Sequence, residues 1–585
     1  MNKVHDVVVA ESHHRRVLWH KPMALLSFVM ALNVASMPLK AYLSESFPWQ
    51  VAQRTNWTVF PSFEEYNSET SRILQAYYTK EYFAHKGKFY LDRSNATTLM
   101  HWSMSIPRNV SPAALASILI QLPGAFFYGD GLRNALAAFA LEISLSSSSS
   151  LAKPPVVYSR CQHVRFVGLP LAEQCVWFVP DTAATIETAS IQVAVYQTML
   201  NWQNKVFLWA KLVFRLGLTA VVCRAMARQY YCHYIVLVAN FLATGLRDKS
   251  IHALEIYVGD PTPVILSNTW ISLAFVVDFW LSASAVGESL LAISQHEDLW
   301  AFHLAILYTS RSVWFAYFFM RLCTYAIKKY RLEESVVPLD PTMVAVASIV
   351  YTAPLMVINT TTALMHMEYA LWSVAVTAEE RDEAIDVLPV TAAVTIMLGA
   401  LPLLFSVTVK WYRTLKVQGE HCRSITELTF DMTLVAQRRM HPGRGPPSAV
   451  LRQRTEDALD LKQRLAFKAF GLKRRFSMSG GGSIYTLHAL NPAYNRMPLF
   501  NHRGSDCFVV CRSSKHHKYD CKMRLSLWRS LDLQEKNPAL CLHKCTTNHL
   551  DCLSRLDATA CPTFKPADST SLCIHLGRQA SPWIL

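Results

Sequence analysis

The chain has 585 residues, of which 51% are apolar, and it carries a net charge of +15. The apolar residues gather in blocks of about 20, the helix length that crosses a ~30 Å hydrocarbon core, which is unlike a water-soluble protein. The basic excess lies beside these blocks and in the C-terminal third, and the sequence contains no nucleic-acid-binding signature. The composition therefore predicts an integral membrane protein with the lipid bilayer, and no nucleic acid, as its partner.

The first apolar block, residues 23–39, follows a short N-terminal segment, residues 1–22, that contains several basic residues. This layout is typical of a signal anchor, or of a signal peptide that is cleaved. Either interpretation makes residues 1–22 cytosolic and places residues 40–203 outside the cytosol.

The segment 40–203 has features of an extracytosolic α+β domain. It contains two cysteines, Cys161 and Cys175, which allow one disulfide, and it contains three glycosylation sequons, at Asn56, Asn95 and Asn109. Apolar spacing predicts helices over residues 62–83, 112–127 and 132–143, followed by a serine linker at 146–150. Four β-branched and aromatic runs predict strands after the linker, "PPVVYSR", "VRFVGL", "CVWFVP" and "SIQVAVYQ".

Five further apolar blocks lie in a membrane region that we assign to residues 204–416. They predict spans at residues 206–223, 264–286, 304–327, 342–364 and 387–409. A sixth block, residues 234–246, is too short to cross, since a helix needs about 20 residues. Basic residues flank it on both sides, which also argues against a crossing between them.

These observations predict a mainly α fold. We expect a polytopic helical membrane bundle of about six spans, a small α+β extracytosolic domain and a largely disordered C-terminal tail. The N-terminus and the tail are then cytosolic, in a membrane of the secretory pathway or the plasma membrane. A cleaved first helix leaves five spans, and counting residues 234–246 as a span puts the tail outside.

One carboxylate lies well inside an apolar block. An ionisable group at mid-membrane costs ~2.5–3.5 kcal/mol on insertion scales, so Asp278 needs a partner or a function. Asp278 lies eight residues before Val286 and Arg311 lies seven residues after Leu304, in consecutive antiparallel helices. At ~1.5 Å per residue both lie about 11–12 Å below the same membrane face, which predicts an ion pair.

Two more bases, Lys211 and Arg215, lie one helical turn apart and bracket the same depth. One acid then stands against three bases. One hypothesis is a net-positive cavity that forms part of a path for an anionic solute. The other is a buried structural pair of Asp278 with Arg311, with the remaining cations reaching the headgroups.

The segment at residues 417–478 is basic and cytosolic in this topology. A cap and an acidic first turn, followed by alternating apolar and basic residues, predict a basic amphipathic helix near residues 455–476. It could lie on the anionic cytosolic leaflet, serve as a calmodulin-type target or be an ordinary solvated helix. Ser477 follows two arginines and suits a basophilic kinase, whose phosphate would weaken lipid contact.

The last segment, residues 479–585, is rich in cysteine. Cytosolic thiols stay reduced, so a zinc site is one hypothesis for this segment. Its weak candidate ligands are Cys541, Cys545, His549 and Cys552. The spacing is irregular and no CxxC pair is present. We therefore predict no metal site, and a disordered tail or an error in the reading frame instead.

Four stretches resemble a group of multi-pass membrane proteins of water moulds (oomycetes) that have no assigned activity. They are "YYCHY" at Tyr230, "YVGDPTPVILSN" at Tyr257, "LYTSRSVWFAYF" at Leu307 and "DEAIDV" at Asp382. The resemblance covers residues 206–416 and implies an architecture, with no activity to carry over.

Two classes of function remain. We expect a structural or receptor-like membrane protein whose extracytosolic domain binds an unidentified small-molecule or protein ligand. The alternative is a transporter or channel with a net-positive intramembrane site. The chain contains no nucleophile elbow, no HExxH and no carboxylate pair at useful spacing, so we predict neither an enzyme nor a cofactor.

Overall fold

The structure is a computed structural model. It describes residues 16–50, 60–84, 86–93, 95–107, 122, 124, 127–145, 158–180, 190–202, 204–244, 251–295, 298–330, 332, 335–337, 339–348, 350, 370, 382–431, 465–466, 468–469, 502–513, 519–527, 543–544, 574–575 and 583–584.

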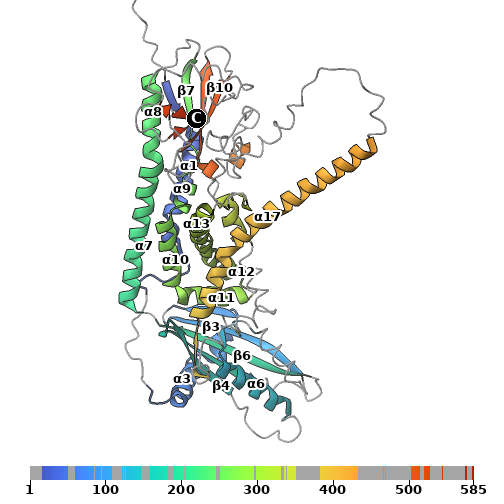
Figure 1. The fold of residues 1–585 in the computed structure, drawn as a ribbon. Coiled ribbons are helices and arrows are strands. Elements are labelled where there is room, and N and C mark those ends of the chain that lie inside the picture. Colours follow the sequence, from blue (N-terminus) through green and yellow to red (C-terminus); the bar gives the residue numbers. More distant parts are fainter. Residues whose placement is uncertain are drawn as a thin grey trace, which may run out of the picture.

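Two β-sheets lie at opposite ends of the molecule, with helices between them (Figure 1). The sheet at the top of the view has the strand order β1-β7-β9-β10-β13-β12-β11, and we call it the terminal sheet because it contains strands from both ends of the chain. The sheet at the bottom has the order β2-β3-β6-β5-β4-β8, and we call it the disulfide sheet. The helices between them form the helical layer.

The disulfide sheet is built mainly from antiparallel neighbours. Its strands are β2 (Phe89–Asp92), β3 (Thr97–Pro107), β4 (Tyr158–Phe166), β5 (Leu169–Pro180), β6 (Ser190–Asn201) and β8 (Ala384–Asp386). A tight turn at Val167 and Gly168, both with positive φ, joins β4 to β5. The edge strand β8 comes from far along the chain and pairs parallel to β4. The "DEAIDV" stretch therefore belongs to this sheet.

Helices cover both faces of the disulfide sheet. The expected helix at 62–83 appears as α3 (Phe63–Tyr77) and α4 (Lys80–Ala84), and that at 132–143 as α6 (Asp130–Leu145). Tyr66 and Leu74 of α3 pack with Trp177, whereas Leu132 and Phe139 of α6 pack on the other side of the sheet. The expected helix at 112–127 lies mostly outside the described residues. Three strands replace the four runs expected after the linker, because the first two runs together form β4.

The terminal sheet contradicts the expectation of a disordered tail. Its main strands are β1 (Arg16–Trp19), β7 (Ile251–Tyr257), β9 (Cys507–Ser513) and β10 (Tyr519–Leu527). β9 pairs antiparallel with β7, and β1 pairs parallel with β7 on its other side. Three short strands extend the sheet beyond β10, β13 (Trp583–Ile584), β12 (Ile574–His575) and β11 (His543–Lys544). Part of the Cys-rich segment is thus folded onto an early strand, which supplies the hydrogen-bonding edge that the isolated tail lacks.

The helical layer contains the long helix α7–α8 at one edge, the start of the long helix α17, and several shorter helices (Figure 1). Its elements are α1 (Lys21–Ala35), α2 (Met37–Lys40), η1 (Ala41–Leu43), α7 (Lys205–Met226), η4 (Ala227–Tyr231), α8 (Cys232–Thr244), α9 (Thr262–Leu266), α10 (Thr269–Trp280), α11 (Ala283–Ser294), α12 (Leu299–Thr309), η5 (Ser310–Ser312), α13 (Val313–Lys329) and the start of α17 (Leu388–Asp431). A π-helical turn, η4, joins α7 to α8. The short block at 234–246 is therefore the end of the long helix.

The prediction of a mainly α bundle of about six spans is wrong. Among the described residues, two helices are long and apolar enough to cross a membrane, Lys205–Ala239 and Thr395–Tyr412. The number rises to four if each of two bent pairs, Lys21–Ala35 with Met37–Leu43 and Thr269–Trp280 with Ala283–Ser294, counts as one span. The expected span at 342–364 lies largely outside the described residues. Two β-sheets lie beyond these helices, and the terminal sheet was not part of the prediction.

Local chemistry explains why the apolar blocks are not straight spans. Pro38 follows the end of α1, and the chain bends by 56° between α1 and the next helical segment. α10 and α11 bend by 70° at Leu281–Ser282. In the block 304–327, the 3₁₀ turn η5 separates α12 from α13. The apolar composition of these blocks is explained by their place in the helical layer, but it does not reveal the bends and the 3₁₀ turn that interrupt the helices.

Trp583 of β13 packs against α8 of the long helix. Its side chain has 0% exposure and packs edge-on against Tyr234, with ring centroids 4.8 Å apart. Its Nε1 donates to the carbonyl oxygen of His233, over 2.9 Å. The third residue from the C-terminus thereby contacts the long helix α7–α8.

We expect Trp583→Ala to lower the free energy of unfolding by about 3–5 kcal/mol, because it empties a fully buried aromatic site. Thermal unfolding of the full chain in detergent, followed by near-ultraviolet circular dichroism, measures the change. Trp300→Ala is the control, since Trp300 is 73% exposed, and it should shift the transition little. Equal shifts for the two variants would contradict docking of the C-terminus.

Candidate functional site: a buried charge network

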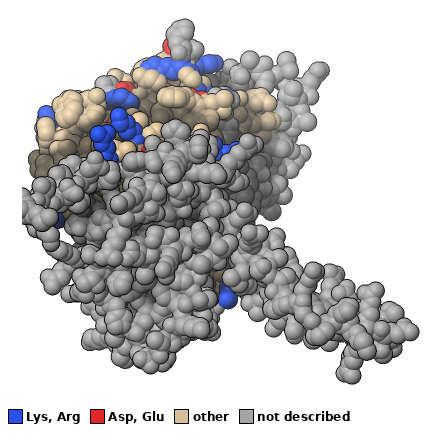
Figure 2. Space-filling view, turned by 90° about the horizontal axis from the view of Figure 1, so that it is seen from above, with Lys and Arg blue, Asp and Glu red and all other residues tan. Residues whose placement is uncertain are grey.

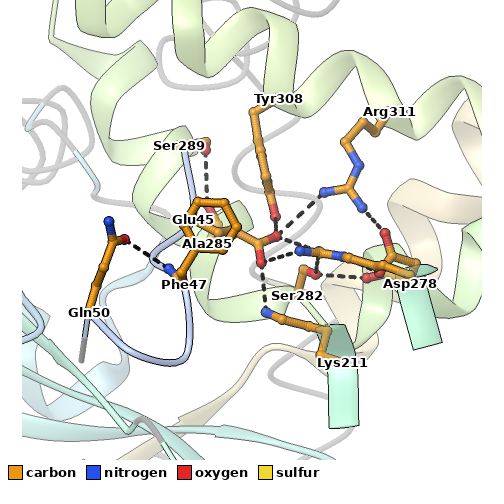
Figure 3. A network of polar contacts seen from close by, with 11 residues as sticks. Glu45, Phe47, Gln50, Lys211, Asp278, Ser282, Ala285, Ser289, Tyr308 and Arg311 are labelled. Carbon is orange, nitrogen blue, oxygen red and sulfur yellow. Dashed lines mark hydrogen bonds and ion pairs between the residues drawn. The ribbon is translucent and has the colours of Figure 1, made fainter. Parts of the chain in front are cut away.

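Five buried ionisable side chains meet inside the helical layer, and we call them the charge network (Figure 3). Glu45 lies in the turn after η1, Lys211 and Arg215 on α7, Asp278 on α10 and Arg311 on η5. The network thus joins segments that are far apart in the sequence. Its members are all at most 7% exposed.

Arg215 is the centre of the network. Its Nη1 and Nη2 atoms donate to the two carboxylate oxygens of Glu45, each over 2.7 Å. Its Nε donates to Oδ1 of Asp278 over 2.8 Å, and Nη2 also reaches Oγ of Ser282 over 2.9 Å. The paired contact with Glu45 is the two-pronged geometry in which guanidinium–carboxylate bonds are strongest.

The other two cations, Lys211 and Arg311, also contact the two carboxylates. Nζ of Lys211 lies 2.8 Å from Oε2 of Glu45. Nη2 of Arg311 donates to Oδ2 of Asp278, while its Nη1 lies 3.6 Å from Oε1 of Glu45. The hydroxyl of Tyr308 donates to Oε1 of Glu45. Each carboxylate oxygen is therefore bonded to at least one donor.

Local structure sets these directions. Lys211 and Arg215 are four residues apart on α7, so both side chains emerge from one face of the helix. Asn204 caps α7 by accepting from the backbone of Val206 and Phe207. Ser282 lies in the bend between α10 and α11, where its Oγ also donates to the backbone oxygen of Asp278 over 2.8 Å. The bend thereby supplies one more polar group to the network.

The cations around Glu45 offset the cost of its burial. Arg215 forms two hydrogen bonds with the Glu45 carboxylate, and Nζ of Lys211 lies 2.8 Å from it. The network then holds three positive and two negative charges. The guanidinium of Arg215 also lies over the ring of Tyr42, 4.7 Å from its centroid, and this cation–π contact further stabilises the buried positive charge.

The structure brings together all four residues that the depth argument selected. Asp278 contacts Arg311 and Arg215, and Lys211 lies on the same network through Glu45. Sequence reasoning missed Glu45, because it follows the first apolar block and had been assigned to the extracytosolic segment. One signal in the sequence could have found Glu45. The predicted site had one acid for three bases, and this excess of buried positive charge favours a further acid nearby. With Glu45 included, the excess falls to one positive charge.

The other predicted sites fall in different parts of the molecule. Cys161 and Cys175 lie opposite one another on β4 and β5 and form a disulfide. Asn95 precedes β3, and its side-chain amide donates to Asp92 and Tyr77. The remaining predicted residues lie outside the described residues: Asn56, Asn109, Ser477, Cys541, Cys545, His549 and Cys552. Within the described ranges, no three His, Cys, Asp or Glu side chains are placed to hold a metal ion.

The predicted basic amphipathic helix is described only at residues 465–466 and 468–469, which are helical. Ala466 is buried there against Met23, Tyr257, Phe508 and Val510. This part of the helix therefore packs against the protein.

Comparison with protein-family models, curated proteins and solved structures finds no match to this chain.

We expect Glu45→Ala to destabilise the protein by about 3–5 kcal/mol, because it leaves the buried charges of Lys211 and Arg215 without their carboxylate. Denaturation of the full chain in detergent measures the loss. Glu64→Ala is the matched control: Glu64 is 75% exposed and pairs with Arg160, so its removal should cost less than about 1 kcal/mol.

A double variant tests whether charge balance is the cause. Glu45→Gln alone raises the excess of the network from one positive charge to two, and adding Lys211→Met restores it to one. The double variant should therefore be more stable than Glu45→Gln. If the two losses simply add, the side chains do not act as one network.

Proposed function

We propose that the chain is an integral membrane protein whose helical layer lies in the bilayer, with the terminal and disulfide sheets on opposite sides. In this proposal the charge network is structural, and the disulfide-sheet domain is a receptor-like binding domain outside the cytosol.

The exposure pattern of α7 carries the proposal. Val213 and Leu216 are 65% and 50% exposed, whereas Lys211 and Arg215 on the same helix are 5% and 0% exposed. A helix in water presents its charges outward and buries its apolar side chains. The reverse arrangement suits a helix whose surroundings are hydrocarbon.

Neighbouring helices show the same outward apolar face. Large exposed apolar side chains lie on α1, α7, α12, α13 and α17: Leu25, Phe28, Leu32, Val213, Val221, Leu307, Leu322, Ile396, Leu404 and Phe405. In water these exposed side chains would form an apolar surface of the kind that marks a contact with lipid or protein.

The end of the layer next to the terminal sheet has exposed basic residues. Lys21 comes shortly after β1, and Arg224 and Arg228 lie on α7 and η4, before α8. Seen from that end, the described surface shows more Lys and Arg than Asp and Glu (Figure 2). Loops rich in Lys and Arg stay in the cytosol. Strands β1, β7 and β9 share this sheet, which supports a common cytosolic side for the N-terminus and the described part of the tail.

The disulfide and the Asn95 sequon lie at the other end. A disulfide persists in an oxidising compartment, so this sheet is expected in the lumen or outside the cell. Its domain has its own core on both sheet faces. Such a domain can present a binding surface on a rigid scaffold.

The protein should remain in the membrane pellet after alkaline carbonate extraction, and Asn95 should carry a glycan. Loss of one glycan in Asn95→Gln, seen as a mobility shift, measures the second expectation. An acceptor sequon appended to the N-terminus is the control and should stay unmodified. Extraction by carbonate would refute membrane insertion, and modification of only the appended sequon would refute the orientation.

A transporter for an anionic solute is the second candidate. Two observations favour it: the network keeps one excess positive charge, and Nη1 of Arg311 has no hydrogen bond among the described residues. Against it, Glu45 removes most of the excess that the sequence had suggested, and it bonds to both Arg215 and Lys211. The structural role therefore has the stronger support.

Vesicles reconstituted with the full chain separate the two candidates. We expect chloride and phosphate flux no greater than in protein-free vesicles, because each cation of the network is already bonded to a carboxylate. Flux that Lys211→Met reduces, in a variant that still folds, would favour the transporter.

A further inference from the structure

Four tyrosines gather at one place in the disulfide-sheet domain. Tyr77 ends α3, Tyr78 follows it, Tyr82 lies on α4 and Tyr90 on β2. Neighbouring ring centroids are 4.8 to 6.4 Å apart. We call this group the tyrosine cluster. Tyr77 is exposed, and Tyr82 and Tyr90 are partly exposed, so the cluster is open to solvent.

A lysine of the same chain occupies the cluster. Nζ of Lys86 lies 3.7 Å from the ring centroid of Tyr82 and 3.8 Å from that of Tyr90. The two rings stand at 72° to one another, so the ammonium meets two aromatic faces at once. Both distances are well inside the ~6 Å range of cation–π attraction.

Among the residues that the structure describes, the ammonium of Lys86 has no carboxylate partner. A carboxylate contacts the cluster through Tyr78, whose hydroxyl donates to Oδ2 of Asp92 over 3.1 Å, and Asp92 is 5% exposed. The ring faces and this nearby negative charge both favour a cation.

We propose that Tyr82 and Tyr90, with the Asp92 carboxylate nearby, form a binding site for a quaternary ammonium group, and that Lys86 fills this site when no ligand is bound. A trimethylammonium group covers more of the two ring faces than a lysine ammonium, and it has no N–H groups to desolvate. It can therefore displace Lys86, whose flexible stem allows the ammonium to move into water. This inference rests on the proposed receptor role and names the ligand class of that domain.

Choline and its uncharged carbon analogue, 3,3-dimethylbutan-1-ol, test the site. They are titrated into the full chain in maltoside micelles, with binding measured by calorimetry. Lys86→Gln should bind choline about five- to tenfold more tightly than the unmodified chain, because the competing ammonium is gone. The analogue should bind at least about tenfold more weakly than choline, since it lacks the charge. Lys80→Gln, which removes an exposed lysine at the start of α4, is the control and should leave choline binding unchanged.

Ring variants locate the site. In the Lys86→Gln background, Tyr82→Phe keeps an aromatic face and should keep most of the affinity, whereas Tyr82→Leu should lose it. Near-ultraviolet circular dichroism checks that both variants fold. The Lys86→Gln comparison does not depend on either of them.

The outcome is decisive in both directions. Equal binding of choline and its uncharged analogue, or no gain in affinity on Lys86→Gln, would overturn the site. Dihexanoylphosphatidylcholine below its micelle concentration distinguishes a lipid headgroup from a free cation, because only a lipid site should prefer it to choline. A chain that carbonate leaves in the membrane but that fails to bind choline would refute the site alone, whereas choline binding by a chain that carbonate extracts would refute only the membrane proposal.

Discussion

The mutual neutralisation of buried charges is the constraint on which the helical layer depends. Arg215 has 0% exposure, and a guanidinium cannot lose its proton to escape burial. It must therefore be held between carboxylates, and Glu45 and Asp278 approach it from two different segments of the chain. Those two acids in turn need Lys211 and Arg311. Because each charge needs the next, the packing of α7 against α10, η5 and the turn after η1 is specified to within a hydrogen-bond length. Apolar contacts alone tolerate sliding of one helix past another, but this set of bonds does not.

The same network explains the bends in the layer. Ser282 lies where α10 gives way to α11, and it bonds to both Arg215 and the backbone of Asp278. A straight helix through this point would use the Asp278 carbonyl for its own ladder and would continue past the network. The bend instead turns α11 toward the disulfide sheet. There, Glu288 of α11 accepts from the side-chain amide of Asn201 at the end of β6, and Gly287 leaves room for Met199 and Phe127. One short helix therefore contacts both the charge network and the disulfide sheet.

The parts that sequence reasoning found are those governed by local physical rules. The meeting of Asp278 and Arg311 followed from the cost of an unpaired buried charge and from the constant rise of a helix. The helices at α3 and α6 followed from apolar spacing, and β5 and β6 from β-branched runs. The disulfide followed from there being only two cysteines, Cys161 and Cys175, in their segment. In each case the deciding information lies within one or two helix lengths of sequence.

The parts that were missed depend on distant partners. β9 is a short apolar run in a Cys-rich segment that reads as a disordered tail, and its pairing with β7 on one side and β10 on the other makes it a strand. β8 is likewise a strand because β4 offers a free edge. Glu45 was missed for the same reason, since a carboxylate in a turn becomes part of the charge network only when α7 supplies Lys211 and Arg215.

The apolar blocks were misinterpreted for a related reason. Their composition reports that they are buried or face lipid, and it does not distinguish a straight crossing from two short helices that meet at a polar bend. The six-span prediction failed at such bends, and the bend at Ser282 is where the hydroxyl of that serine joins the charge network.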